Sequence, residues 1–200
     1  PIETQPNLPL QSFSAMQLHR LKIPELSDDQ LVYVLNRVLL IHHGKFLREV
    51  LLEALARPSC ADKIDKQRVY NTLSELARDR NDRDDTYHWI HEGQQHAQTL
   101  DQAFEKTVRW DIRELSFRAE DPGDPNLMPL VQKLVRKYAK KLPQLLDYIT
   151  TLLTAYGIEP PANLEELAVE AGSLSSGGIW MPGEAAPDGG EKKLWLPGQT

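Results

Sequence analysis

Apolar residues recur at helical spacing along most of the chain between residues 27 and 171, and glycine or proline interrupts the pattern at intervals. Residues three or four apart share one face of an α-helix, so this spacing favours helices that bury one face. Before residue 172 there is no long alternation of apolar and polar residues, which is the pattern of a half-buried strand. We therefore expect an all-α fold, a multi-helix bundle of about six to eight helices.

The first long helix is expected to begin at Ser27, because Ser27 and Gln30 have the spacing of a capping box. Residues 31–41 are apolar nearly all round, which predicts a central, buried helix that ends at Gly44. Further helical patterns and one charged connector (78–85) follow over residues 45–57, 65–80, 86–120, 127–142, 143–156 and 164–171.

Composition divides the chain into three segments. Residues 1–24 hold three prolines in the first ten positions and are expected to be extended, with one short helix. Residues 25–171 form the predicted bundle, in which the Asp-Pro-Gly-Asp-Pro stretch at 121–125 is the clearest internal break and a possible sub-boundary. Residues 172–200 contain seven glycines and three prolines, which predicts an irregular tail.

Charge and cysteine content narrow the class of protein. The 23 basic and 29 acidic residues give a formal net charge of −6, which argues against a surface that binds nucleic acid or an anionic membrane all over. Cys60 is the single cysteine, so no internal disulfide can form. The amino-terminal residues lack a signal-peptide pattern, and the apolar run at 31–41 is shorter than the ~20 residues of a membrane span. We expect a cytoplasmic protein that does not bind a membrane.

Histidines crowd one predicted helix at His88, His91 and His96, and Glu92 follows His91. A zinc-protease motif needs two histidines four residues apart on one helix face. His91 and His96 are five apart and diverge by about 140° around the helix axis. We interpret these histidines as solvated side chains and predict no metal site. The acidic stretch 82–85 lacks the spacing and the glycine of a calcium loop.

The sequence contains no recognisable catalytic motif. There is no glycine-rich phosphate loop, and the glycines near Ser175 and Ser176 lack the lysine that such a loop carries. No serine or cysteine has the surroundings of a nucleophile. We predict no catalytic residue and no cofactor; an enzyme with a site built from scattered residues stays an open alternative.

The tail carries one short motif twice. The sequences Gly-Ile-Trp-Met-Pro-Gly at 178–183 and Lys-Leu-Trp-Leu-Pro-Gly at 193–198 align over six positions, fifteen residues apart. The two copies can pair as a small β-hairpin, with residues 187–190 as the turn. Alternatively, each tryptophan inserts into a groove of a partner, and two copies give avidity. The expected partner-binding residues are Ile179, Trp180, Pro182, Leu194, Trp195 and Pro197.

Cations gather on the predicted 127–142 helix. They are Lys133, Arg136, Lys137, Lys140 and Lys141. At helical spacing the four lysines share one face, opposite Leu130, Leu134 and Tyr138. This is the pattern of any surface helix, and it also suits a face that contacts nucleic-acid phosphates.

Two functions follow as hypotheses. The first is a non-enzymatic adaptor, or a subunit of a larger assembly, that binds protein partners through its helical body and the tryptophan motifs of its tail. The alternative is a nucleic-acid-associated subunit or regulator that uses the basic face of the 127–142 helix. The sequence does not specify an oligomeric state.

Overall fold

The computed structural model describes residues 15–18, 20–40 and 44–170, and this part of the chain is helical without any β-strand. The all-α prediction is confirmed there, and eight of the described helices have seven residues or more. The predicted tail hairpin lies outside these residues. In chain order the elements are α1 (Ala15–Leu18), a 3-10 turn η2 (Ile23–Glu25), α2 (Asp28–Val38), α3 (Gly44–Ala56), α4 (Pro58–Ala61), α5 (Lys66–Asp79), α6 (Arg83–Gln98), α7 (Ala103–Ala119), α8 (Leu127–Tyr138), α9 (Leu145–Ala155) and α10 (Leu164–Glu170).

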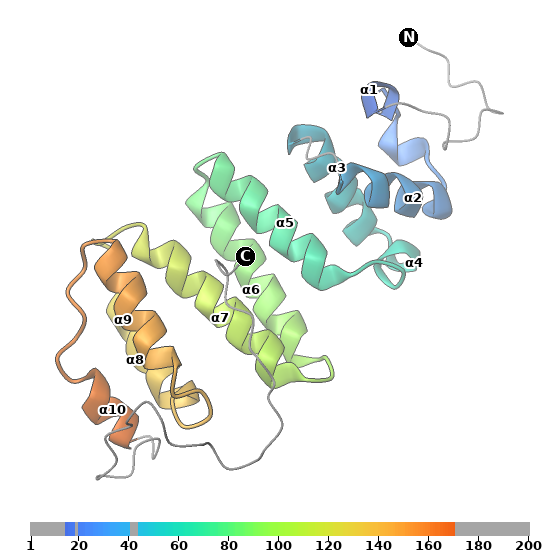
Figure 1. The fold of residues 1–200 in the computed structure, drawn as a ribbon. Coiled ribbons are helices and arrows are strands. Elements are labelled where there is room, and N and C mark those ends of the chain that lie inside the picture. Colours follow the sequence, from blue (N-terminus) through green and yellow to red (C-terminus); the bar gives the residue numbers. More distant parts are fainter. Residues whose placement is uncertain (1–14, 19, 41–43, 171–200) are drawn as a thin grey trace.

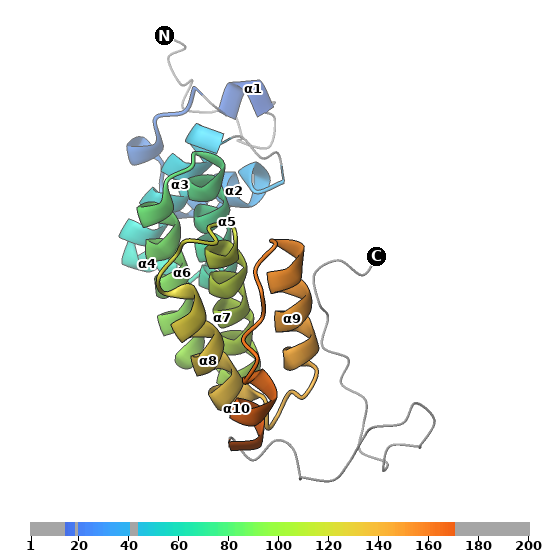
Figure 2. The same ribbon diagram turned by 90° about the vertical axis from the view of Figure 1, so that its left-hand side faces the viewer.

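The helices form an elongated bundle. Figure 1 shows α2 to α4 at one end, α5, α6 and α7 side by side in the middle, and α8 to α10 at the other end. In the turned view of Figure 2, α9 and α10 lie on α7 and α8 at that far end. Most helices pack on the helices that precede and follow them in the chain, so each part of the bundle is held mainly by contacts between sequence neighbours.

Helix α2 begins as predicted but ends earlier. The Ser27 side chain accepts a hydrogen bond from the Gln30 backbone, and the Gln30 side chain accepts one from the Ser27 backbone. After Val38 the chain leaves the helix by a tight turn, and the Leu40 side chain is 74% exposed. The prediction of a central helix that ends at Gly44 is therefore wrong, because Gly44 is the first residue of α3 and α2 lies at one end of the bundle.

The charged stretch predicted as a connector is mostly helical. Only the residues between Asp79 and Arg83 are non-helical. Asn81 adopts a left-handed conformation with φ 58°, which ends α5, and the Asp82 side chain caps the start of α6. The prediction of a connector over 78–85 is wrong because the aspartates that follow Asp82 stabilise the positive end of the α6 dipole.

The segment 86–120, which shows one helical pattern in the sequence, forms two helices, α6 and α7, that pack against each other. Gln102, with φ 60°, precedes α7. Gly93 does not break α6; a Cβ added at Gly93 would overlap the indole ring of Trp110 on α7. The Trp110 indole N–H donates to the Gln67 side chain of α5, which itself donates to the Gly93 carbonyl oxygen at 3.3 Å. The missing side chain at Gly93 therefore lets the two helices approach closely.

Buried apolar side chains form three clusters in the described residues. The amino-terminal cluster joins α1 to α5 and includes Trp89 of α6; among its fully buried members are Leu18, Leu31, Leu35, Leu47, Leu51 and Leu73. The middle cluster lies between α6 and α7 and consists of Ile90, Ala97, Trp110 and Phe117, with Tyr70 and Tyr87 against it. The carboxyl-terminal cluster joins α7 to α10. None of the described helices is long and apolar enough to cross a membrane.

Candidate functional site

The six residues predicted to bind a partner through the tail lie in residues 172–200, outside the described part of the chain. The last described helix, α10, ends at Glu170 and packs on α8. The described part of the chain thus ends with a helix that packs on α8, the helix of the predicted basic face.

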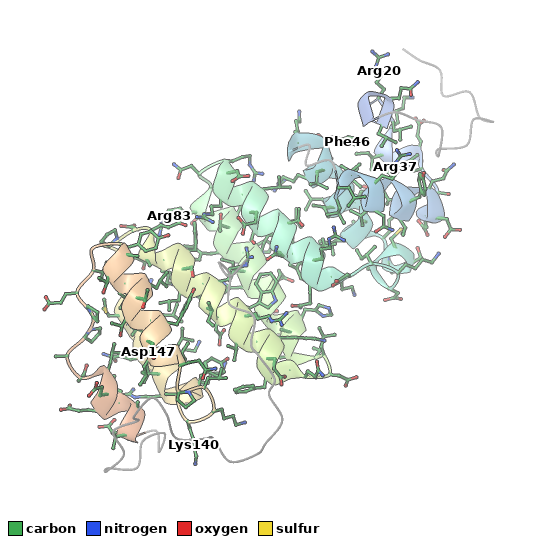
Figure 3. All side chains as sticks on the ribbon, viewed as in Figure 1. Arg20, Arg37, Phe46, Arg83, Lys140 and Asp147 are labelled. Atoms are coloured by element: carbon green, nitrogen blue, oxygen red, sulfur yellow. The ribbon has the colours of Figure 1, made fainter. Side chains whose placement is uncertain are left out.

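The basic face is present on α8 and just beyond its carboxyl-terminal end. All five predicted cations are exposed, and Lys133, Arg136 and Lys140 have no ion-pair partner within the described residues. On the opposite side of the helix, Leu134 and Tyr138 are buried in the carboxyl-terminal cluster. Figure 3 shows the Lys140 side chain pointing away from the body at the end of α8. These three cations define what we call the α8 cation row.

The other two cations of the predicted set contact the body of the protein. The Lys137 ammonium donates to the Asp111 carboxylate on α7 at 2.9 Å and lies 4.7 Å from the Tyr138 ring centre. The Lys141 ammonium lies 4.6 Å from the ring centre of Phe104, also on α7. Both contacts hold α8 against α7, so these two lysines are partly committed to packing.

Asp111 is a buried acceptor that joins three helices. Its side chain is 5% exposed. One carboxylate oxygen accepts from Lys137 and from the Tyr138 hydroxyl, and the other accepts from the Gln94 amide of α6 at 2.9 Å. A buried carboxylate is stable only when it is well partnered, and this one has a cation and two further donors.

The same Gln94 amide extends the interactions to a second buried carboxylate. It donates to Glu114 at 2.8 Å, and Glu114 accepts from the Arg118 guanidinium at 2.9 Å. Arg118 also donates to Asp124 at 2.9 and 3.2 Å, and its guanidinium lies 4.4 Å from the Tyr87 ring centre. The Tyr87 hydroxyl donates to Asp124 at 2.9 Å.

These contacts make one connected set, the α6–α8 network. It links α6, α7, α8 and the turn before α8, and its members are Tyr87, Gln94, Asp111, Glu114, Arg118, Asp124, Lys137 and Tyr138.

Burial and hydrogen bonding set the protonation states within the network. Burial raises the pKa of the Tyr138 hydroxyl, and the hydrogen bond to Asp111 raises it further. Burial and the hydrogen bond to Asp124 likewise raise the pKa of Tyr87. Burial alone raises the pKa of Asp124, but hydrogen bonds from the Asn126 backbone, Tyr87 and Arg118 outweigh it and lower that pKa. Both phenols therefore remain donors at neutral pH, and Asp124 remains an ionised acceptor.

The arrangement of the network is that of a structural cross-link. Asp111, Glu114 and Asp124 each accept from two or more protein donors, so their oxygens are engaged within the fold. None of these contacts was predicted from the sequence. A signal was present, because Asp111 lies on the apolar stripe of α7, three residues after Val108 and four before Leu115.

The histidines of α6 do not converge. His88 and His91 are exposed, which confirms the prediction that they are solvated. His96 is half-buried, with its ring edge-on to that of Tyr70 and the ring centres 6.0 Å apart, so the prediction of a solvated side chain is wrong for His96. Burial and the nearby Lys66 charge lower the His96 pKa. Within the described residues, no group of three or more His, Cys, Asp or Glu side chains is placed to hold a metal ion.

The chain matches no protein-family model, no curated protein and no solved structure.

Proposed function

We propose that this protein is a non-enzymatic adaptor or subunit of a larger assembly that binds protein partners through its tail and its helical body. The single observation that carries the proposal is the tryptophan motif duplicated at 178–183 and 193–198. Tryptophan buries a large area with little loss of conformational freedom and dominates many binding interfaces. Two copies on one chain also raise the apparent affinity for a partner that offers two grooves.

The body supports this proposal as a platform for the tail. The α6–α8 network and the carboxyl-terminal cluster join α7, α8 and α10, and α10 is the element from which the tail continues. Polar contacts of this kind are directional, so they set the register of α8 on α7 more narrowly than apolar packing does.

The second candidate function is nucleic-acid binding by the basic face. One observation favours it: residues 127–146 contain five lysines and arginines and no acidic residue. Two observations weigh against it. Lys137 and Lys141 are engaged with α7, and the neighbouring α10 exposes Glu165, Glu166 and Glu170.

A pull-down with the full-length chain tests the leading proposal. We expect the double substitution Trp180→Ala/Trp195→Ala to lose most of the partner that the wild type recovers, and each single substitution to lose part of it. A hot-spot tryptophan contributes at least about tenfold in affinity, and the loss of the second copy removes avidity.

The matched control is Leu174→Ala, an apolar truncation in the same tail outside both motifs. It should recover as much partner as the wild type does. Equal recovery by the double variant and the wild type would show that the tail motifs do not bind the partner.

A further inference from the structure

The α8 cation row presents three exposed charges on the carboxyl-terminal half of α8 and in the turn that follows it. Arg136 follows Lys133 by three residues, about one turn of α8, and Lys140 lies in the turn two residues beyond the end of α8. All three side chains are exposed, and no ion pair within the described ranges reaches them. By contrast, Arg113 and Arg118 of the adjacent α7 are paired with Glu75 and Glu114.

The terminal segments of this chain do not have the charge to neutralise the row. Residues 171–200 carry three acidic side chains against two lysines, a net charge of −1. Residues 1–14 carry one acidic side chain, Glu3, and no lysine or arginine. Neither segment holds a run of carboxylates that would neutralise the row.

The surroundings of the row favour a short acidic segment over a nucleic-acid strand. Helix α10 packs on α8 through Leu164, Leu167 and Ala168 and exposes Glu165, Glu166 and Glu170. Residues 142–170 contain five acidic residues and no lysine or arginine. A polyanion that extends past the row meets these carboxylates and is repelled.

We infer that the α8 cation row docks an acidic segment of a protein partner, with carboxylates three and four residues apart on a helix. Such a helix presents its carboxylates on one face at the spacing of the row. The inference rests on the proposed adaptor function, since it takes the partner to be a protein, but the row is separate from the tail motifs. It adds a second, electrostatic contact that sets orientation and partner choice.

Fluorescence anisotropy with the full-length chain tests the inference. The probe is a labelled helical peptide of about 16 residues, roughly four turns, with three glutamates in its middle, spaced by three and four residues, so that its carboxylates do not extend past the row. The same peptide with glutamine in place of glutamate is the reference ligand. A buffer with about 0.05 M NaCl keeps screening below physiological levels.

Two charge-reversal variants separate a local effect from a general one. The first is Lys133→Glu/Arg136→Glu/Lys140→Glu, in the row. The matched control is Arg20→Glu/Lys45→Glu/Arg68→Glu, which changes the net charge by the same amount at exposed positions near α1 and on α3 and α5. Figure 3 shows Arg20 and Lys140 at opposite ends of the molecule.

We expect the row variant to weaken binding of the glutamate peptide by about tenfold or more, and the control by less than about threefold. The glutamine peptide should not bind. The variant Trp180→Ala/Trp195→Ala should bind the glutamate peptide as the wild type does. The pull-down therefore tests the tail motifs, and the peptide titration tests the cation row independently of them.

Three outcomes overturn the inference. They are no binding of the glutamate peptide by the wild type, equal weakening by both charge-reversal variants, and tighter, row-dependent binding of an oligo(dT) of about 16 nucleotides. The last outcome would establish the row as a nucleic-acid contact.

Discussion

The amino-terminal cluster and the α6–α8 network hold their helices together by different means. The cluster consists almost wholly of aliphatic side chains, such as Leu31, Leu47 and Leu51, each at most 1% exposed. The network consists of carboxylates, an amide, phenols and cations, which bridge α6, α7 and α8 through hydrogen bonds.

The difference teaches how each part of the chain gains its stability and its geometry. Burial of aliphatic surface stabilises strongly but has little directional preference. A buried carboxylate contributes little net stability beyond offsetting its own desolvation, yet its loss leaves donors without acceptors. We therefore expect truncation to be most costly in the cluster, and the network to matter more for the position of α8.

The largest effect is expected in the amino-terminal cluster. Leu47→Ala should lower the free energy of unfolding by about 2–5 kcal/mol, because it removes a buried side chain and leaves a cavity. Urea titration followed by circular dichroism measures this loss. Leu40→Ala, at a side chain that is 74% exposed, is the control and should change stability by less than about 0.5 kcal/mol. Similar losses for both variants would contradict the packing of α3.

The next effect tests the close approach of α6 and α7. Gly93→Ala should destabilise the chain by about 1–3 kcal/mol, because the new methyl group overlaps the Trp110 ring. The emission of Trp110 should change as well. At Gly44 an added Cβ has no neighbour within 4 Å, so Gly44→Ala should leave stability unchanged or raise it by up to about 1 kcal/mol. A neutral result at Gly93 would show that the two helices are farther apart.

A substitution in the α6–α8 network should affect α8 more than the amino-terminal helices. Asp111→Asn removes the negative charge that Lys137 and Tyr138 contact. We expect it to lower the free energy of unfolding by about 1–3 kcal/mol. Hydrogen exchange should increase in α8 more than in α2 or α3, because the network holds α8 while the amino-terminal cluster is untouched. Asp101→Asn, at an exposed residue between α6 and α7, is the control. Uniform exchange across all helices would argue against a separate role for the network.

The smallest effect is a pH dependence. The folded-state pKa of Asp124 is lowered, so this carboxyl stabilises the fold above its unfolded pKa of about 3.9, and the contribution is lost as the pH falls through the folded value. Asp124→Asn should flatten the decline of stability below about pH 4. Unfolding midpoints measured at a series of acidic pH values test this, and an unchanged slope would be the contrary result.

Several local features of the fold could be predicted because they depend on neighbours in the sequence. Ser27, the predicted helix start, caps α2 through a contact three residues away. The alternation of buried Leu134 and exposed Lys133 on α8 likewise follows from helical spacing. The turn between α6 and α7 was not predicted, because Gln102 adopts its left-handed conformation without glycine or asparagine to indicate it.

The candidate site was predictable only in part. The five cations were identified, but their different environments depend on α7, which supplies Asp111 to Lys137 and Phe104 to Lys141. These contacts join residues that are far apart in the sequence, and no spacing rule relates them.

The sequence by itself determined the helical class, most helix starts, the amphipathic face of α8 and the repeated tryptophan motif, because each depends on residue types within a few positions. The tertiary structure decided which helix lies at the end of the bundle, which carboxylates are buried, and which of the exposed cations contact α7. These depend on how α6, α7 and α8 pack, and the same lysine is a solvated charge or a partner of Asp111 according to which helix lies beside it.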